Sequence, residues 1–211
     1  TPLARTAIKN INLEIGRGEF IAIIGHTGSG KSTLVQHLNG LLQPTTGQVL
    51  VDGVDLKGKG PEVKNARRKV GMVFQYPEHQ LFEETVYQDI AFGPRNLDLP
   101  EEEVEQRVRR AMKFVGLDFD TYARRSPFQL SGGQMRRVAI AGVVALEPEY
   151  LILDEASAGL DPRGRDEILG QVLKLYRQTG ISVILVSHNM EEVARLAHRL
   201  IVMREGRIVF D

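Results

Sequence analysis

The sequence predicts an α/β fold with a mostly parallel sheet, a small antiparallel β subdomain and a helical insert. Three observations lead to this prediction. The apolar run Phe20–Ile24 enters a glycine-rich turn that is followed by residues with helical spacing. Two more apolar runs, at residues 150–153 and 181–186, flank an amphipathic segment at 163–178, which is typical of a crossover between parallel strands. A charged helical stretch at residues 100–116 lies between these regions.

The first half of the chain carries the signals of a strand, a helix and a hairpin. Phe20–Ile24 is apolar throughout and is bounded by glycines, so we expect a strand that is buried on both faces. Apolar residues then recur at helical spacing around a stop signal at Asn39-Gly40: Leu34, Leu38 and Leu41. Asp52-Gly53 suits a tight turn between two short apolar runs, which predicts an antiparallel hairpin.

The second half of the chain predicts further helices and a closing hairpin. Pro100–Gly116 is expected to be a helix, because three acidic residues stand at its positive end. Its apolar residues lie on one helical face: Val104, Val108, Met112 and Val115. Asn189 followed by Glu192 fits a helix start with a capping box, and residues 200–210 fit a hairpin.

The length and composition indicate one domain, residues 1–211, with two parts. We expect the core with the β subdomain at residues 1–75 and 147–211, and the helical subdomain at 76–146. The chain starts at Thr1 without Met and stops directly after a strand-like run, so we expect both natural termini to be truncated.

The composition also excludes several classes of protein. Lys+Arg 27 balance Asp+Glu 27, which argues against general binding to the phosphate backbone of nucleic acids, and runs such as Arg107–Arg110 are interpreted as solvated faces. The absence of Cys excludes a disulfide scaffold and a Cys-ligated zinc module. No apolar run approaches the roughly 18 to 20 residues of a spanning helix, so a membrane role requires partners.

The glycine-rich turn after the first strand matches a phosphate-binding loop. Residues 25–32 have the pattern G-x-x-x-x-G-K-[ST] between a predicted strand and a predicted helix. Glycines let backbone N–H groups surround phosphate oxygens, and the helix N-terminus adds positive potential. Lys31 is expected to reach the β and γ phosphates, Ser32 to bind Mg²⁺ and Thr33 to contact the α-phosphate. The predicted phosphate-binding residues are Gly25, His26, Thr27, Gly28, Ser29, Gly30, Lys31, Ser32 and Thr33.

Two carboxylates end a second predicted strand. Asp154 and Glu155 follow the apolar residues 151–153, at the edge of a parallel sheet where ligands bind. We expect Asp154 to hold Mg²⁺ through water and Glu155 to polarise the attacking water as a general base. Taken alone, an Asp-Glu strand end is commonly the start of a solvated loop, but this alternative becomes minor downstream of a complete phosphate loop.

The segment LSGGQ at residues 130–134 is a second candidate for phosphate contacts. Gly132 and Gly133 stand before a predicted helix at 135–145 and expose further N–H groups. Taken alone, the same five residues are explained equally well as an ordinary loop and helix cap.

Together, these motifs resemble those of the ATP-binding cassette ATPases over nearly the whole chain. Six features follow the order of that family: the phosphate loop, Gln75, LSGGQ, Asp154-Glu155, the segment 157–161 and His188. The resemblance implies a P-loop NTPase core in the ATP-binding cassette fold, with ATP and Mg²⁺ as ligands. It also implies a head-to-tail dimer in which Ser131, Gly132, Gly133 and Gln134 of one subunit face the ATP held by the other.

The same resemblance implies roles for three further residues. Gln75 would sense Mg²⁺ and the attacking water, Asp161 would belong to a loop that crosses the dimer, and His188 would contact the γ-phosphate. Taken alone, a Gln, an Asp or a His after a strand is usually structural, so these roles rest on the resemblance.

Three segments are similar to the ATP-binding A components of energy-coupling factor transporters, which import vitamins and cobalt or nickel ions. They are His26-Thr27, residues 36–45 and residues 75–82. The similarity implies a second ATPase subunit, a sister chain or a second copy, together with a transmembrane coupling subunit and a membrane substrate-binding subunit. The chain would lie at the cytoplasmic face of a prokaryotic cell membrane. The sequence departs from the broader family pattern in two ways. The aromatic residue that is expected to stack on adenine near the N-terminus is missing, which we attribute to truncation. Ala156 stands where many relatives carry Pro.

Two other functions stay open at this point. A soluble cassette ATPase that acts on nucleic acid or ribosomes usually carries a long coiled-coil insertion or two cassettes, and neither fits in 211 residues. A regulatory module without turnover is disfavoured by Glu155. Leu81 and Phe82 have the make-up of an anchor for the transmembrane partner, and we favour this interpretation over the alternative that they pack the helical insert against the core.

Overall fold

The computed structural model describes residues 6–211, so the chain start at Thr1 lies outside the described residues. The contacts within the chain divide it into two compact units. Unit 1 contains residues 6–72, Glu149–Glu155 and Tyr176–Asp211, and unit 2 contains Val73–Pro148 and Ala156–Leu175. Residues 156–175, which the sequence analysis placed with the core, thus group with the helical residues of unit 2.

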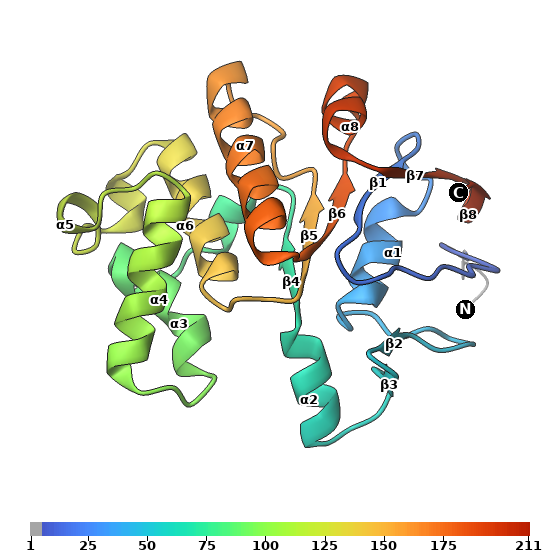
Figure 1. The fold of residues 1–211 in the computed structure, drawn as a ribbon, viewed down its shortest axis with the longest axis horizontal. Helices are drawn as coiled ribbons and strands as arrows, with labels where there is room; N and C mark the ends of the chain where they lie inside the picture. Colours follow the sequence, from blue (N-terminus) through green and yellow to red (C-terminus); the bar gives the residue numbers. More distant parts are fainter. Residues whose placement is uncertain (1–5) are drawn as a thin grey trace. The chain divides into compact units, whose positions relative to one another are not determined.

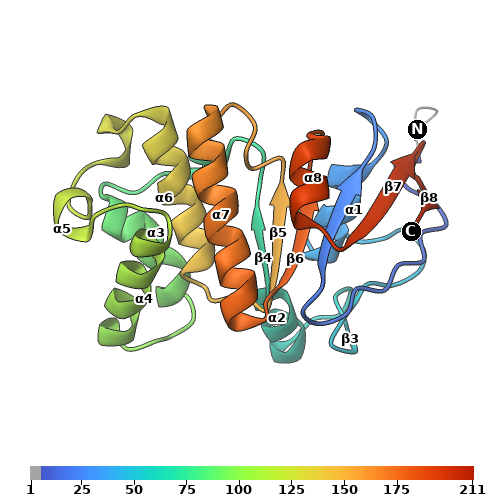
Figure 2. The ribbon, with the colours of Figure 1, turned by 45° about the horizontal axis from the view of Figure 1, so that its top comes forward.

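The main sheet has six strands in the order β4-β5-β6-β1-β7-β8 (Figure 2). The strands are β1 (Phe20–Ile24), β4 (Val70–Val73), β5 (Tyr150–Asp154), β6 (Ser182–Val186), β7 (Arg199–Arg204) and β8 (Arg207–Phe210). β1 pairs in parallel with β6 and β7, and β5 pairs in parallel with β6. β7 and β8 form the predicted antiparallel hairpin. The mostly parallel sheet expected from the apolar runs is therefore confirmed.

The central strand is buried on both faces. β1 lies between β6 and β7, and its residues Phe20, Ile21 and Ile23 are at most 1% exposed. Both sides of such a strand must be apolar, which explains the continuous hydrophobic run in the sequence. The carboxyl ends of β1 and β5 lead directly into the phosphate loop and Glu155, so this buried sheet supports the candidate site.

Unit 1 also contains three helices and the predicted hairpin. The helices are α1 (Lys31–Leu38), α2 (Pro61–Arg68) and α8 (Met190–Leu196), and the hairpin consists of β2 (Leu50–Val51) and β3 (Val54–Asp55). Asp52 and Gly53 both have positive φ, as the tight turn requires. Leu41 lies beyond α1 and is 59% exposed, because Asn39 Oδ1 accepts a hydrogen bond from the Leu41 N–H as the helix ends. The predicted helical spacing therefore included one leucine, Leu41, that lies beyond the end of the helix at Leu38.

Unit 2 is a helical cluster. Its helices are α3 (Val86–Arg95), α4 (Glu101–Phe114), α5 (Phe119–Tyr122) and α6 (Gly132–Val144), with 3₁₀ turns at Pro77–Gln80 and Pro127–Gln129. α3, α4 and α6 pack against one another (Figure 1). Val104, Val108 and Met112 of α4 are fully buried, so the predicted apolar face is confirmed. α7 (Pro162–Thr179) begins in this unit and ends in unit 1.

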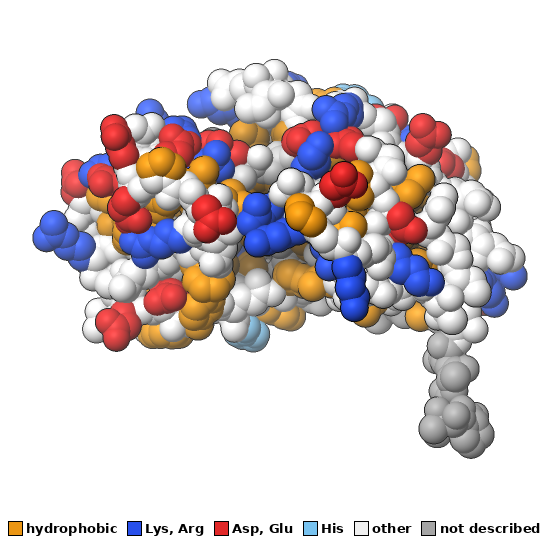
Figure 3. All heavy atoms as spheres, turned by 90° about the horizontal axis from the view of Figure 1, so that it is seen from below, with side chains coloured by type: hydrophobic (Ala, Val, Ile, Leu, Met, Phe, Trp, Pro, Cys, Tyr) orange, Lys and Arg blue, Asp and Glu red, His pale blue; other side chains and the backbone are white. Residues whose placement is uncertain are grey.

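The surface carries charges of both signs. Lys, Arg, Asp and Glu side chains intermingle over the face seen in Figure 3, with hydrophobic side chains between them. Among residues 6–211, no helix has the length and apolar character needed to cross a membrane.

Candidate nucleotide-binding and catalytic site

The phosphate loop connects β1 to α1 in a conformation that depends on glycine. Gly25, Gly28 and Gly30 have φ values of 152°, 80° and 102°, which other residues adopt only with strain. A Cβ atom at Gly25 would stand 2.3 Å from the carbonyl oxygen of Met203, so no side chain fits there. At Gly28, by contrast, the space where a Cβ would point is open. The loop therefore leaves free space above its backbone.

Lys31 is 5% exposed and lies inside this loop. Its Nζ donates to the carbonyl oxygens of Gly25 at 2.7 Å and His26 at 3.2 Å. Burial lowers the pKa of the Lys31 amine, and the nearby Glu155 and Asp154 carboxylates oppose that shift. A buried cation that donates its described hydrogen bonds to neutral carbonyl groups is well placed to bind a phosphate anion.

Ser29 gives independent evidence that the loop fits a ligand. Its Oγ is buried and has no hydrogen-bond partner in the described part of the chain. Buried hydroxyl groups without partners are rare, because leaving one unpaired costs about 1–3 kcal/mol. Phosphate oxygens would satisfy this hydroxyl. The donor set of the loop thus fits the phosphates of ATP.

Ser32 and Asp154 come together beside the loop. Ser32 Oγ donates to Asp154 Oδ1 at 3.3 Å, although the two residues lie far apart in the sequence. Burial raises the pKa of Asp154, and the Ser32 hydrogen bond acts in the opposite direction. A hydroxyl and a carboxylate are hard oxygen donors, the kind that Mg²⁺ prefers. Within residues 6–211, no group of three or more His, Cys, Asp or Glu side chains is arranged to hold a metal ion.

Glu155 and His188 form a second pair at the ends of β5 and β6. His188 Nε2 lies 2.5 Å from Glu155 Oε1, and the two side chains are 46% and 18% exposed, respectively. Glu155 has a φ of 51°, while its backbone N–H donates to the carbonyl oxygen of Val186 at 3.0 Å. Non-glycine residues with positive φ cost energy and cluster at functional sites. A partly exposed carboxylate beside an imidazole can accept a proton from a water molecule.

The start of α8 holds His188 in place. Ser187 Oγ donates to Glu192 Oε2 at 2.8 Å and accepts from the Asn189 N–H at 3.0 Å. Asn189 caps the helix as predicted, since its side chain accepts from the N–H groups of residues 191 and 192. The second half of the predicted capping box is wrong, because the Asn189 N–H donates to Ser187 Oγ and the Ser187 hydroxyl in turn donates to the Glu192 carboxylate. This buried acid instead supports the backbone on either side of His188.

The LSGGQ segment lies in unit 2 and forms the start of α6. The helix begins at Gly132, not after the glycines as predicted, because Ser131 is a strong N-cap. Ser131 Oγ accepts from the Gln134 N–H at 3.3 Å, and Gln134 Oε1 accepts from the Ser131 N–H at 3.0 Å. Gly132 and Gly133 are exposed, with open space where a Cβ would stand. Their predicted contact with a partner's ATP stays a prediction.

Gln75 and Asp161 also belong to unit 2. Gln75 is exposed at the end of β4. Asp161 is exposed and caps α7, because its Oδ1 accepts from the Gly164 N–H at 3.2 Å. The structure therefore gives Asp161 a local role, and the functions implied for both residues stay predictions.

Two features of unit 2 depend on contacts that the local sequence pattern does not predict. Arg136, in α6, is 4% exposed and pairs with Glu78, although a helix pattern alone treats Arg as a surface residue. Leu81 is 9% exposed and packs inside the unit, while Phe82 is 58% exposed, so the two residues do not act as one anchor. The Phe82 ring instead meets the exposed Phe92 ring edge-to-face at 5.0 Å.

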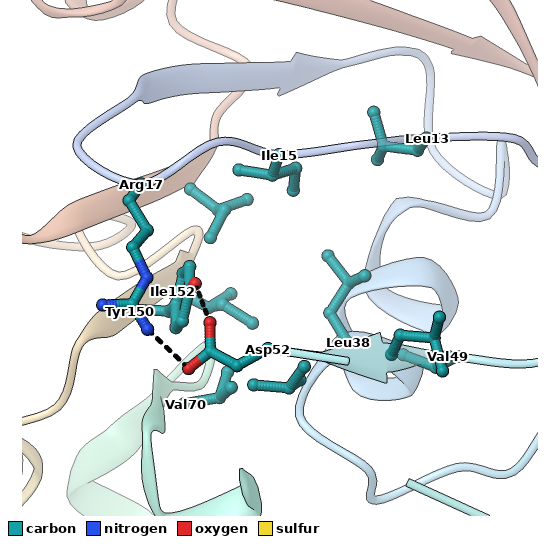
Figure 4. Close-up of a pocket in the computed structure, with 12 residues that line it drawn as sticks. Leu13, Ile15, Arg17, Leu38, Val49, Asp52, Val70, Tyr150 and Ile152 are labelled. Atoms are coloured by element: carbon teal, nitrogen blue, oxygen red, sulfur yellow. Dashed lines mark hydrogen bonds and ion pairs between the residues drawn. The ribbon is translucent and has the colours of Figure 1, made fainter. Parts of the chain in front are cut away.

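A separate cavity of about 310 Å³ lies under the β2–β3 hairpin in unit 1 (Figure 4). Its lining is mostly apolar: Leu13, Ile15, Leu38, Val49, Leu50, Val51, Val70, Ile152 and Ile184, with Arg17, Asp52 and Tyr150 at one end. Asp52 accepts hydrogen bonds from Arg17, Lys69 and Tyr150. The Lys69 bond is the main cause that lowers the Asp52 pKa to about 2. No phosphate-loop residue lines this cavity, so it is distinct from the nucleotide site.

Known proteins are similar to this chain in sequence and in fold. A sequence model of the family described as ABC transporter matches residues 8–158. The chain is 60% identical over 211 residues to the Energy-coupling factor transporter ATP-binding protein EcfA2 of Clostridium tetani (strain Massachusetts / E88), and the match covers 100% of this chain and 73% of that protein.

Two solved structures are similar over 97% of this chain. One is cbiO1 from Clostridium perfringens, described as part of the ABC transporter complex cbiONQ, with a TM-score of 0.85, 42% identity and 80% of that chain covered. The other is the ATP-binding cassette MJ0796 in a dimeric post-hydrolysis state bound to ADP and Pi, with a TM-score of 0.86, 32% identity and 89% of that chain covered.

Proposed function

The chain belongs to the ABC transporter family and is an ATPase, and from this premise we propose that it is the ATP-hydrolysing peripheral subunit of an energy-coupling factor importer. The imported solute would be a micronutrient, either a vitamin or a transition-metal ion. The observation that carries this proposal is the 60% identity, over the full chain, to a protein named as the ATP-binding subunit of such a transporter. The alternative of a soluble cassette ATPase on nucleic acid or ribosomes has no comparable support.

In this proposal, the residues of unit 1 bind ATP and prepare water for attack. Lys31 would leave its bonds to the loop carbonyls for the β and γ phosphates, and Ser29 would gain the partner that it lacks. Glu155 would accept the proton of the attacking water, and His188 would donate to the γ-phosphate. The 2.5 Å contact between Glu155 and His188 would keep the base oriented until the phosphate arrives.

Ser32 and Asp154 of unit 1 would hold Mg²⁺, which neutralises charge on the β and γ phosphates when bound. The Mg²⁺ contact implied for Gln75 stays a prediction. A second ATPase subunit, a sister chain or a second copy, would place its Ser131–Gln134 against the same ATP. The exposed N–H groups of Gly132 and Gly133 at the start of α6 support this arrangement, because a helix N-terminus attracts phosphate. Asp161 of each chain would lie at the subunit contact.

The partners in the membrane would be a transmembrane coupling subunit and a substrate-binding subunit, with this chain at the cytoplasmic face. Phe82 and Phe92 are 58% and 47% exposed and touch each other, which makes them a candidate anchor for the coupling subunit. Asp89 holds the loop in place, since its carboxylate accepts from the N–H groups of residues 82 and 83. The loop that carries Phe82 begins directly after Gln75, so a movement of Gln75 on ATP binding would be transmitted to Phe82 through a few residues.

Recovery of the complex from membranes tests the proposal. Full-length protein that carries both Phe82→Ser and Phe92→Ser should recover far less transmembrane subunit, while its melting temperature changes little because both rings are exposed. Leu50→Ser, a change of an exposed apolar residue in unit 1, is the matched control and should recover the parent amount. Co-purification with ribosomes or nucleic acid in place of membrane proteins would overturn the importer proposal.

A further inference from the structure

Arg136 joins three segments of unit 2 through one buried guanidinium group. Its Nε and Nη2 donate to the two carboxylate oxygens of Glu78 at 2.9 and 2.7 Å. Its Nη1 donates to the carbonyl oxygen of Ala158, and its Cζ lies 5.7 Å from the centre of the Tyr76 ring. We call this group of four residues the Arg136 junction. It connects the loop after β4, the helix α6 and the loop before α7.

Each segment of the junction carries a candidate site residue a few positions away. Gln75 is next to Tyr76, Gln134 is two positions before Arg136, and Asp161 is three positions after Ala158. These are the residues proposed to meet ATP, Mg²⁺ or the second subunit. A movement of any one segment therefore reaches the other two through a single side chain.

The chemistry of the junction requires arginine. A planar guanidinium binds both oxygens of a carboxylate and still has donors for a carbonyl oxygen in another direction, whereas an ammonium group has no such fixed fork. Burial raises the pKa of Glu78, but the Arg136 hydrogen bonds, a backbone hydrogen bond and the charge of Arg136 together lower it below its ordinary value, which favours the charged carboxylate. A buried charge that is held by a carboxylate and a carbonyl oxygen is sensitive to small displacements, because losing the carboxylate leaves it unpaired.

Backbone strain lies at the same place. Tyr76 has a φ of 55°, although it is not glycine, and it directly follows Gln75. Such a conformation persists only when its surroundings hold it. The contact of the Tyr76 ring with Arg136 and the anchoring of Glu78 two residues later provide that hold.

We propose that Arg136 is a positioning residue for ATP hydrolysis, whose guanidinium keeps Gln75, the LSGGQ segment and the Asp161 loop in one arrangement. The inference rests on the proposed roles of those residues, but not on the importer or its solute. Arg136 does not itself touch ATP. Its loss should therefore reduce turnover and leave the affinity for ATP, which the phosphate loop of unit 1 determines, nearly unchanged.

The test compares Arg136→Lys and Glu78→Gln with Arg109→Lys, which alters an exposed Arg–Glu pair of α4 in the same unit. Turnover, ATP affinity and melting temperature are measured for each protein, alone at high concentration and with its partners. Both junction variants should lose about 10- to 100-fold in kcat, the scale of a misplacement of about 1 Å, with ATP affinity within threefold of the parent. The double variant should lose no more than the Arg136→Lys variant, because both changes break one contact.

A kcat of the Arg136→Lys variant equal to that of the parent would overturn the proposal. A decrease in kcat that accompanies a lower melting temperature and disappears when the assay is cooled would also overturn it, because unfolding would then explain the decrease. ATP affinity that falls together with kcat would also overturn it. Failure to recover a membrane complex would refute the importer proposal alone, since the turnover of the isolated chain still decides the role of Arg136.

Discussion

Replacing Glu155 with Gln removes a proton acceptor and changes almost nothing else. The amide has the same shape as the carboxylate, can keep one hydrogen bond to His188 Nε2, and sits on the same backbone with its φ of 51°. We therefore expect the free energy of unfolding to change by no more than about 1 kcal/mol, the worth of one ordinary hydrogen bond. The phosphate loop is untouched, so ATP affinity should stay at the parent value.

The expected effect on turnover is large. A positioned general base contributes about two to four orders of magnitude in rate, which corresponds to about 2.7–5.4 kcal/mol in the activation barrier. Glu155 is only 18% exposed, so bulk water has limited access to replace it. Because hydrolysis stops after binding, dimers that contain ATP should accumulate.

The assay combines single-turnover hydrolysis in the assembled complex with calorimetry and sedimentation of the nucleotide-bound protein. Glu191→Gln is the matched control, because Glu191 is an exposed acid in the first turn of the neighbouring α8. It should hydrolyse ATP at the parent rate. A turnover within threefold of the parent in Glu155→Gln, with folding intact, would refute the assignment of the base.

Three other predictions follow from the site and the fold. Lys31→Ala should abolish tight MgATP binding while the protein stays folded, because the buried amine is lost; calorimetry with undiminished affinity would remove the phosphate-loop assignment. The isolated chain should show a turnover per molecule that rises with its concentration, since LSGGQ is proposed to serve a neighbour's ATP; a high rate that is flat down to nanomolar protein would contradict the shared site. Asp52→Asn should lower the free energy of unfolding at neutral pH but not at low pH. The pKa of Asp52 is about 2 in the folded protein and 3.8 ordinarily, so the charged carboxylate stabilises the fold above pH 3.8, and this stabilisation is lost as the pH falls toward 2. Denaturant unfolding between pH 6 and 2 measures the difference from the parent, which should shrink toward zero, and a constant difference would contradict the role of the Lys69 and Arg17 contacts.

Local patterns predicted most of the elements, because their causes lie within a few residues. The hairpin at Asp52-Gly53 follows from a turn that accepts positive φ at both positions. The buried face of α4 follows from a spacing of three and four residues. The start of α6 was placed too late, since the capping strength of Ser131 outweighed the low helix propensity of the two glycines after it.

The pairing of side chains from distant segments required the sheet. Asp154 is opposite Val186 in the register of β5 and β6, and this register brings Glu155 to His188. Tertiary packing also decided the positions of Leu81 and Phe82. The sequence showed two adjacent large apolar residues, but only the packing of unit 2 buries Leu81 and leaves Phe82 exposed beside Phe92. Arg136 is the clearest case, because helical periodicity treats Arg as a surface residue until a carboxylate from another segment is known to face it.

The sequence by itself determined the phosphate loop, the order of the motifs and the mostly parallel sheet, since each depends on residue types at short spacing. The tertiary structure alone decided which polar groups face one another: Ser32 with Asp154, Glu155 with His188, and Arg136 with Glu78. The physical reason is that a hydrogen bond or ion pair acts over only about 3 Å. The segments that carry these side chains are brought together by the burial of the sheet and of the helical cluster, and a shift of one residue in strand register would separate the paired groups.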